Sequence, residues 1–190
     1  MKAMEEKILK DGVVLPGNIL KVGNFLNQQI DIAFMTEVGK EVARLFQGET
    51  VTKVMTIEAS GIPFATLIAQ AMGVDEVIVK KHASANVSGD VYSSEIYSYT
   101  HGHSYTAVVS KEYLQEGDRV LLADDFLACG NALKGMMKMV EDAKAHLVGC
   151  VAAIEKGFQG GGDELRSKGI HVESLAIVEK MEDDGTILFR

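Results

Sequence analysis

A buried strand followed by two acidic residues, a loop of small residues and a helix constrains this chain more than any other segment. Residues 120–123 are all apolar, which predicts a buried strand that Asp124 and Asp125 end. The loop 128–132 follows, with Gly130 in its turn, and opens a helix that runs to about residue 144. Free N–H groups at a helix start suit a phosphate, and carboxylates suit ribose hydroxyls or Mg²⁺. The segment therefore predicts a site for a phosphorylated sugar.

Strands and helices alternate along the rest of the sequence. This alternation predicts an α/β fold with an open, mainly parallel twisted sheet flanked by helices on both faces. Asp31 is the expected N-cap of one helix. Ligands of such sheets bind beyond the carboxyl ends of the strands, where the candidate motifs fall. We expect strands over 51–57, 74–80, 105–109, 119–123, 147–154 and 171–178, and helices over 4–10, 31–47, 61–72 and 163–168 in addition to the helix after Gly130.

Three stretches have no clear helical or strand pattern. Residues 11–26 contain three glycines and a proline, which predicts an irregular segment. Residues 82–103 are polar and rich in Ser and Tyr with weak alternation, which indicates an exposed hairpin or mobile loop outside the core. The three glycines at 160–162 predict a flexible loop.

Composition limits the classes of protein to which the chain can belong. A length of 190 residues predicts one domain spanning 1–190. The net charge of −8 gives no basic surplus for a nucleic-acid partner. Cys129 and Cys150 have no metal-ligand spacing and suggest no disulfide framework, so we expect a cytoplasmic protein. No apolar run approaches the length of a membrane span.

The segment around the acidic pair resembles the phosphoribosyl-diphosphate (PRPP) signature of type I phosphoribosyltransferases. Further segments resemble the xanthine branch of that family in the same order: 13–22 (VVLPGNILKV), 24–27 (NFLN), 58–63 (EASGIP) and 155–158 (EKGF). The resemblance covers nearly the whole chain. It implies the type I phosphoribosyltransferase fold, with residues 1–30 and the C-terminal part forming a small hood that binds the base.

The resemblance also implies a role for each matching residue on the PRPP side. Asp124 and Asp125 would be the catalytic pair and would hold the ribose 2- and 3-hydroxyls. Many members place hydroxyl residues in the phosphate loop, whereas this chain has Cys129, Asn131 and Ala132, so backbone amides must carry more of the binding. Lys80 stays open as an alternative to Lys81 at the diphosphate. The PRPP-binding residues implied are Ala128, Cys129, Gly130, Asn131, Ala132, Ser60, Gly61 and Lys81.

Four residues would bind xanthine on the same resemblance: Leu20, Asn27, Lys156 and Phe158. The ammonium of Lys156 is a donor only, which favours a 6-oxo group over an amino group. The amide of Asn27 both donates and accepts, which suits the 2-oxo edge that separates xanthine from hypoxanthine. The ring of Phe158 offers an apolar face to the base.

The activity implied is transfer of the phosphoribosyl group from PRPP to xanthine, which gives xanthosine 5-monophosphate and diphosphate in purine salvage. Mg²⁺ would arrive with PRPP and need no dedicated protein ligands, and the family usually forms homodimers. Guanine or hypoxanthine stays open as the base, because both share the 6-oxo group. A PRPP-binding regulator without catalysis is a second alternative, although no basic face is present for DNA. A generic nucleotide-binding domain is a third, which the combined motifs argue against.

Overall fold

A six-stranded sheet forms the centre of the molecule, in a computed structural model that describes residues 1–82, 89–98, 102–182 and 184–190. The strand order is β10-β9-β8-β7-β3-β4. All neighbours are parallel except β10, which pairs antiparallel with β9. The predicted mainly parallel sheet is therefore confirmed. Its strands are β3 (Lys53–Ile57), β4 (Asp75–Val79), β7 (Arg119–Leu127), β8 (His146–Lys156), β9 (Val172–Met181) and β10 (Ile187–Phe189).

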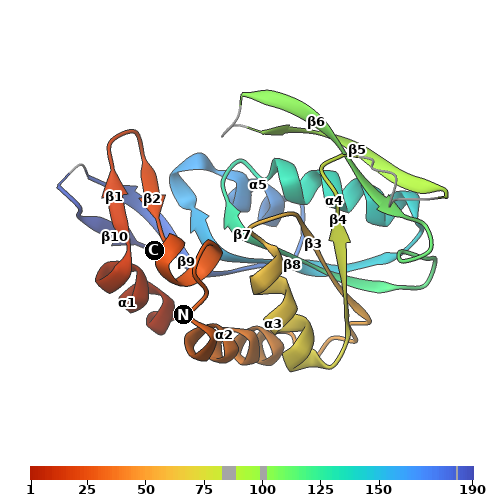
Figure 1. Ribbon diagram of the computed structural model, residues 1–190, viewed down its shortest axis with the longest axis horizontal. Coiled ribbons are helices and arrows are strands. Elements are labelled where there is room, and N and C mark those ends of the chain that lie inside the picture. Colours follow the sequence, from red (N-terminus) through yellow and green to blue (C-terminus); the bar gives the residue numbers. More distant parts are fainter. Residues whose placement is uncertain (83–88, 99–101, 183) are drawn as a thin grey trace.

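Helices cover both faces of this sheet (Figure 1). Helices α2 (Ile32–Leu45) and α3 (Ile62–Met72) lie on one face, and α4 (Asn131–Asp142) and α5 (Gly161–Ser167) lie on the other. Asp31 caps α2 as predicted, because its side chain accepts a hydrogen bond from the amide of Phe34 at 3.1 Å. Gly39 lets α2 and α3 approach closely, since an added Cβ would lie 2.4 Å from the carbonyl oxygen of Leu67.

The N-terminal segment is more regular than its glycines suggest. Helix α1 (Lys2–Asp11) is followed by the antiparallel hairpin β1 (Val13–Leu15) and β2 (Ile19–Lys21), and then by the π-helical turn η1 (Gly23–Asn27). The irregular segment expected over 11–26 was therefore wrong. The glycines lie between these short elements or at their ends. Strands of three residues are too short to show a periodic pattern. Helix α1 contacts β9, where the N-terminal amine donates to the carbonyl of Leu175, and Figure 1 shows the hairpin at the same end of the molecule as β10.

The strand expected over 105–109 does not belong to the central sheet. Strands β5 (Val91–Ser98) and β6 (His103–Ser110) form an antiparallel hairpin of their own, which packs over α4 in Figure 1. Among the described residues, a single bridge between Lys80 and Val108 links it to the end of β4. The hairpin alternative for 82–103 is confirmed over the residues that pair, whereas 83–88 and 99–101 lie outside the described residues. Its expected place outside the core was wrong, because Ile96 of β5 is buried in the core cluster that α4 helps to form. An alternating apolar face packs equally well on a helix or in a sheet, so sequence could not choose.

The acidic pair lies inside β7 and does not end it. The register with β8 continues past it, pairing Asp124 with Ala152 and Phe126 with Ile154. Strand β7 is longer than predicted because β8, which runs to Lys156, continues to pair with it beyond the acidic residues. Neighbouring side chains of a strand point to opposite faces, so the two carboxylates start out on opposite sides of the sheet.

The glycines at 160–162 also differ from expectation. Gly161 and Gly162 are buried and begin α5, where a Cβ on Gly162 would lie 2.1 Å from Oε1 of Glu155. These glycines permit close packing, and the predicted flexible loop was wrong. Strand β10 was not predicted, since its three residues carry too little pattern.

Candidate active site

Asp125 connects three segments that are far apart in the sequence. Its Oδ2 accepts a hydrogen bond from Nδ2 of Asn27 at 3.0 Å, and its Oδ1 accepts one from Oγ of Ser60 at 3.0 Å. Asn27 ends the turn η1, and Ser60 precedes helix α3. Three of the residues singled out in the sequence thus meet at one carboxylate, which is only 6% exposed.

Asp124 occupies a different environment one residue earlier. Its Oδ1 accepts from the amide of Asp125 at 3.0 Å, and the residue lines a hollow together with Tyr105 and the loop 128–132. Burial, and then the negative charge of Asp125, raise the pKa of Asp124 well above its usual range, while Lys81 opposes this rise. The two carboxylates therefore differ: Asp125 accepts from two side chains, whereas within the described residues Asp124 accepts from a backbone amide.

The loop 128–132 and the start of α4 form the floor of this hollow. Gly130 is the N-cap of α4 and has a φ of 77°, a left-handed conformation that glycine adopts without strain. Asn131 turns its side chain away and donates to the carbonyl of Tyr97 at 3.1 Å. The amides of Cys129 and Gly130 have no acceptor within the described ranges. The loop therefore presents two backbone amides without an acceptor beside the hollow, and its binding of a phosphate stays a prediction.

The segment between β3 and α3 lies against both carboxylates. Ser60 bonds to Asp125, and an added Cβ on Gly61 would lie 3.4 Å from Oδ1 of Asp124. The same Cβ would lie 2.4 Å from Oγ1 of Thr56, so only glycine fits at this position. The peptide bond between Glu58 and Ala59 is cis.

The geometry separates Lys80 from Lys81. Nζ of Lys80 lies 3.3 Å from Oε2 of Glu58, and Lys80 lines a different hollow, between β4 and β6. Nζ of Lys81 lies 5.6 Å from the ring centre of Tyr105, which lines the hollow, and its charge acts on Asp124. Lys81 is therefore the lysine that faces the acidic pair.

Lys156 ends β8 on the side of the N-terminal hairpin. Its Nζ donates to the carbonyl oxygen of Asn18 at 2.9 Å and lies 5.8 Å from the ring centre of Phe126. Burial lowers the pKa of Lys156. An ammonium has three donors, so hydrogen-bonding capacity remains for a ligand. Leu20 is buried in the hairpin, and Phe158 is 38% exposed on the turn η2 (Gly157–Gln159).

A family model described as the phosphoribosyl transferase domain matches residues 27–175. The chain belongs to the phosphoribosyl transferase family. A xanthine phosphoribosyltransferase of Lachnoclostridium phytofermentans is 49% identical over 191 residues, which cover 100% of this chain and 98% of that protein. A xanthine phosphoribosyltransferase of Bifidobacterium adolescentis is 50% identical over 192 residues, with 100% of both chains covered. Xanthine phosphoribosyltransferase 1 of Clostridium perfringens is 52% identical over 185 residues and 97% of each chain.

Solved structures place this phosphoribosyl transferase in the type I fold. The APRTase of Giardia lamblia complexed with 9-deazaadenine superposes with a TM-score of 0.79 and 23% identity over 93% of this chain and 98% of that one. The adenine phosphoribosyltransferase of Thermoanaerobacter pseudethanolicus gives a TM-score of 0.67 and 26% identity over 77% and 81% of the two chains. No helix in the described part of this phosphoribosyl transferase has the length and apolarity to cross a bilayer.

Two residues of this phosphoribosyl transferase site escaped the sequence analysis. Tyr105 lines the hollow half-buried, and burial followed by the charge of Asp124 raises the pKa of its hydroxyl. Thr56 is fully buried beside Gly61, and its hydroxyl has no hydrogen-bond partner among the residues that the structure describes. The alternation of Tyr with polar residues was visible in the sequence, but nothing local to Thr56 distinguishes it from an ordinary strand residue.

Proposed function

We propose that this phosphoribosyl transferase joins xanthine to PRPP and releases diphosphate and xanthosine 5-monophosphate, as a cytoplasmic enzyme of purine salvage. The hydrogen bond between Asn27 and Asp125 carries the proposal, because it places a base-side residue directly on the ribose-side carboxylate. The three relatives named for xanthine transfer, each about half identical over nearly the full chain, support the choice of base.

The base would lie between the N-terminal hairpin and the end of β8. Asn27 uses its Nδ2 on Asp125, so its carbonyl oxygen is available to accept from a base N–H. Lys156 donates to Asn18 and keeps donors for the 6-oxo group. Phe158 and Leu20 would supply apolar contacts to the ring. In this proposal residues 1–30 and the C-terminal part would form the hood over the base.

PRPP would lie across the acidic pair, with its 5-phosphate in the loop 128–132 and its diphosphate near Ser60, Gly61 and Lys81. Breaking the bond between C1 and diphosphate leaves positive charge on the ribose. Asp124 and Asp125 would hold the ribose hydroxyls and stabilise that charge, while Lys81 would offset the charge of the leaving group.

Mg²⁺ fits this arrangement as a companion of PRPP. The described residues contain no group of three or more His, Cys, Asp or Glu side chains that could hold a metal alone. Two neighbouring carboxylates suit the usual Mg²⁺ site, in which substrate phosphates supply other ligands. When bound, the ion would neutralise charge on the diphosphate.

The base is tested by mixing the protein with PRPP and Mg²⁺ and following xanthine, guanine, hypoxanthine and adenine separately. We expect a clear preference for xanthine, and Asn27→Ala should reduce its advantage over hypoxanthine by about tenfold in kcat/KM, since one polar contact to the 2-oxo edge is lost. Asn24→Ala is the matched control, because Asn24 lies in the same turn and donates to the carbonyl of Asp11 at 2.8 Å, away from the acidic pair. Preference for guanine or hypoxanthine would overturn the base, and PRPP binding without turnover would favour a regulator.

We also propose that two copies of the chain form a homodimer, as the resemblance to type I members implies. Sedimentation equilibrium at micromolar protein should return twice the chain mass of 20.5 kDa. A single species of the chain mass would contradict the dimer and leave the proposed reaction intact.

A further inference from the structure

Two carbonyl groups of the phosphate loop (residues 128–132) are held on the side of helix α5. The carbonyl oxygen of Ala128 accepts from the amide of Gly161 at 3.1 Å, and that of Cys129 accepts from Nζ of Lys134 at 3.2 Å. A trans peptide places its C=O and the following N–H on opposite sides. The two contacts therefore turn the amides of Cys129 and Gly130 away from α5. These are two of the amides that would bind the 5-phosphate.

Lys134 is held on the far side of this loop by an acidic residue of α5. Its Nζ lies 2.6 Å from Oε2 of Glu164, in addition to the contact with the carbonyl of Cys129. The other carboxylate oxygen of Glu164 accepts from Lys168 at 2.6 Å. A lysine in the first turn of a helix that binds phosphate would ordinarily suggest a direct phosphate ligand. Here its charge is paired, and its position is fixed against the peptide backbone.

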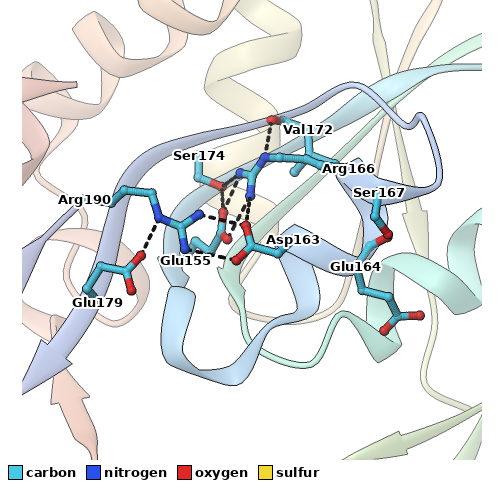
Figure 2. Close-up of polar contacts among 9 residues, drawn as sticks. All are labelled: Glu155, Asp163, Glu164, Arg166, Ser167, Val172, Ser174, Glu179 and Arg190. Atoms are coloured by element: carbon cyan, nitrogen blue, oxygen red, sulfur yellow. Dashed lines mark hydrogen bonds and ion pairs between the residues drawn. The ribbon is translucent and has the colours of Figure 1, made fainter.

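Helix α5 is itself fastened to the sheet, so it can serve as a fixed support. Figure 2 shows Arg166 of α5 bonded to the buried carboxylate of Glu155, at 3.0 and 2.6 Å, and to Oγ of Ser174 at 3.3 Å. It also shows Arg190 reaching Asp163 of the same helix with two hydrogen bonds of 2.7 and 3.0 Å. The start of α5 touches the loop so closely that a Cβ on Gly161 would lie 2.2 Å from the carbonyl oxygen of Ala128.

We propose that Lys134, held by Glu164, is a positioning residue that orients the phosphate loop for the 5-phosphate of PRPP and does not contact the phosphate itself. The inference rests on the proposed PRPP site and adds Lys134 and Glu164 to the residues that form it. It explains how a loop without hydroxyl side chains keeps its amides aimed at a ligand. A preorganised loop binds its anion without a further ordering cost.

The test compares variants of the full chain by titration calorimetry with ribose 5-phosphate, a probe that lacks the diphosphate and so reports on the phosphate loop and the acidic pair alone. Lys134→Met should weaken binding about tenfold, because the hydrogen bond to the Cys129 carbonyl is lost, and Glu164→Ala about threefold or more, because Lys134 loses the carboxylate that holds it in place. In the transferase assay the KM for PRPP should rise more than kcat falls. Thermal unfolding of both variants should stay close to that of the unmodified chain, since exposed ion pairs contribute little to stability.

Glu164→Ala separates positioning from direct binding by the sign of its effect. If Lys134 were a phosphate ligand, removal of its acidic partner would free the ammonium and tighten ribose 5-phosphate binding. The matched controls are Lys138→Met and Asp142→Ala, which remove an ion pair of 2.8 Å one turn further along α4 and should leave binding within about twofold. Equal affinity of the Lys134 variants and these controls would overturn the positioning role alone. Absence of binding to the unmodified chain would overturn the phosphate loop as well.

Discussion

Replacing Asp124 and Asp125 together by asparagine is expected to lower kcat/KM for PRPP by about a thousandfold or more, because each charged group in a transition-state site is worth about a hundredfold or more. Asparagine keeps the size of each side chain and removes the negative charge that would face the ribose as its bond to diphosphate breaks. Steady-state kinetics with xanthine and PRPP measure the loss. Asp75→Asn, at an exposed position of β4, is the control and should keep full activity. Wild-type turnover by the double variant would falsify the assignment of the acidic pair.

Replacing Asp124 alone by asparagine is expected to raise the stability of the folded chain, although it lowers activity. Because burial and the charge of Asp125 raise the pKa of Asp124, the folded state is more stable with Asp124 protonated than with Asp124 ionised. The favourable contribution of Asp124 is therefore complete below its unfolded pKa of about 3.8 and is lost as the pH rises through its folded pKa. Asp124→Asn cannot ionise, and its side-chain oxygen can still accept from the amide of Asp125.

Asp124→Asn should thus unfold at a higher temperature than the unmodified chain near neutral pH, by about 2–4 °C for a gain of about 1 kcal/mol. The difference should shrink as the pH falls toward 3.8. Thermal unfolding at several pH values tests both statements. A loss of stability together with the loss of activity would mean that Asp124 supports the fold, and its burial would then need another explanation. A gain of stability with a loss of activity is typical of a residue kept for function.

The sequence was sufficient where the signal is local. A run of apolar residues, an acidic pair and a glycine turn lie within thirteen positions, so the order of strand, loop and helix around Gly130 could be predicted. Asp31 could be assigned as a cap because an N-cap bonds to an amide three residues later. Even here the end of β7 was placed too early, since the pairing that extends it belongs to β8.

Contacts between distant segments could not be predicted from the residues. Glu164 follows Lys134 by 30 positions, and nothing near either residue indicates the other. The glycines that begin α5 appeared flexible because composition does not reveal that Glu155 and Ala128 pack against them. The choice of Lys81 over Lys80 likewise needed the β5–β6 hairpin, whose Tyr105 lies beside it. The missing information in each case is which surfaces meet.

Arg166→Met is expected to destabilise the fold by about 3–5 kcal/mol, because it leaves the carboxylate of Glu155 buried without its charged partner. The side chain of Glu155 is 1% exposed and receives two hydrogen bonds from Arg166, while Ser174 supplies one further donor. Urea unfolding measures the change in free energy. Arg44→Met is the matched control: Arg44 bonds in the same two-pronged way to Glu41, but at the surface of α2, where little change is expected.

The double variant Arg166→Met with Glu155→Leu decides whether the pair itself stabilises the protein. Breaking one partner of a buried ion pair exposes the desolvation cost of the other, so removal of both should restore much of the stability lost in Arg166→Met. Side chains of Glu155 and Lys156 leave β8 on opposite faces, one toward α5 and the other toward the hairpin. If the double variant regains stability but has a higher KM for PRPP than the unmodified chain, the ion pair is kept to hold α5 against the phosphate loop. If the stability and the KM for PRPP both return to the values of the unmodified chain, the ion pair serves folding alone.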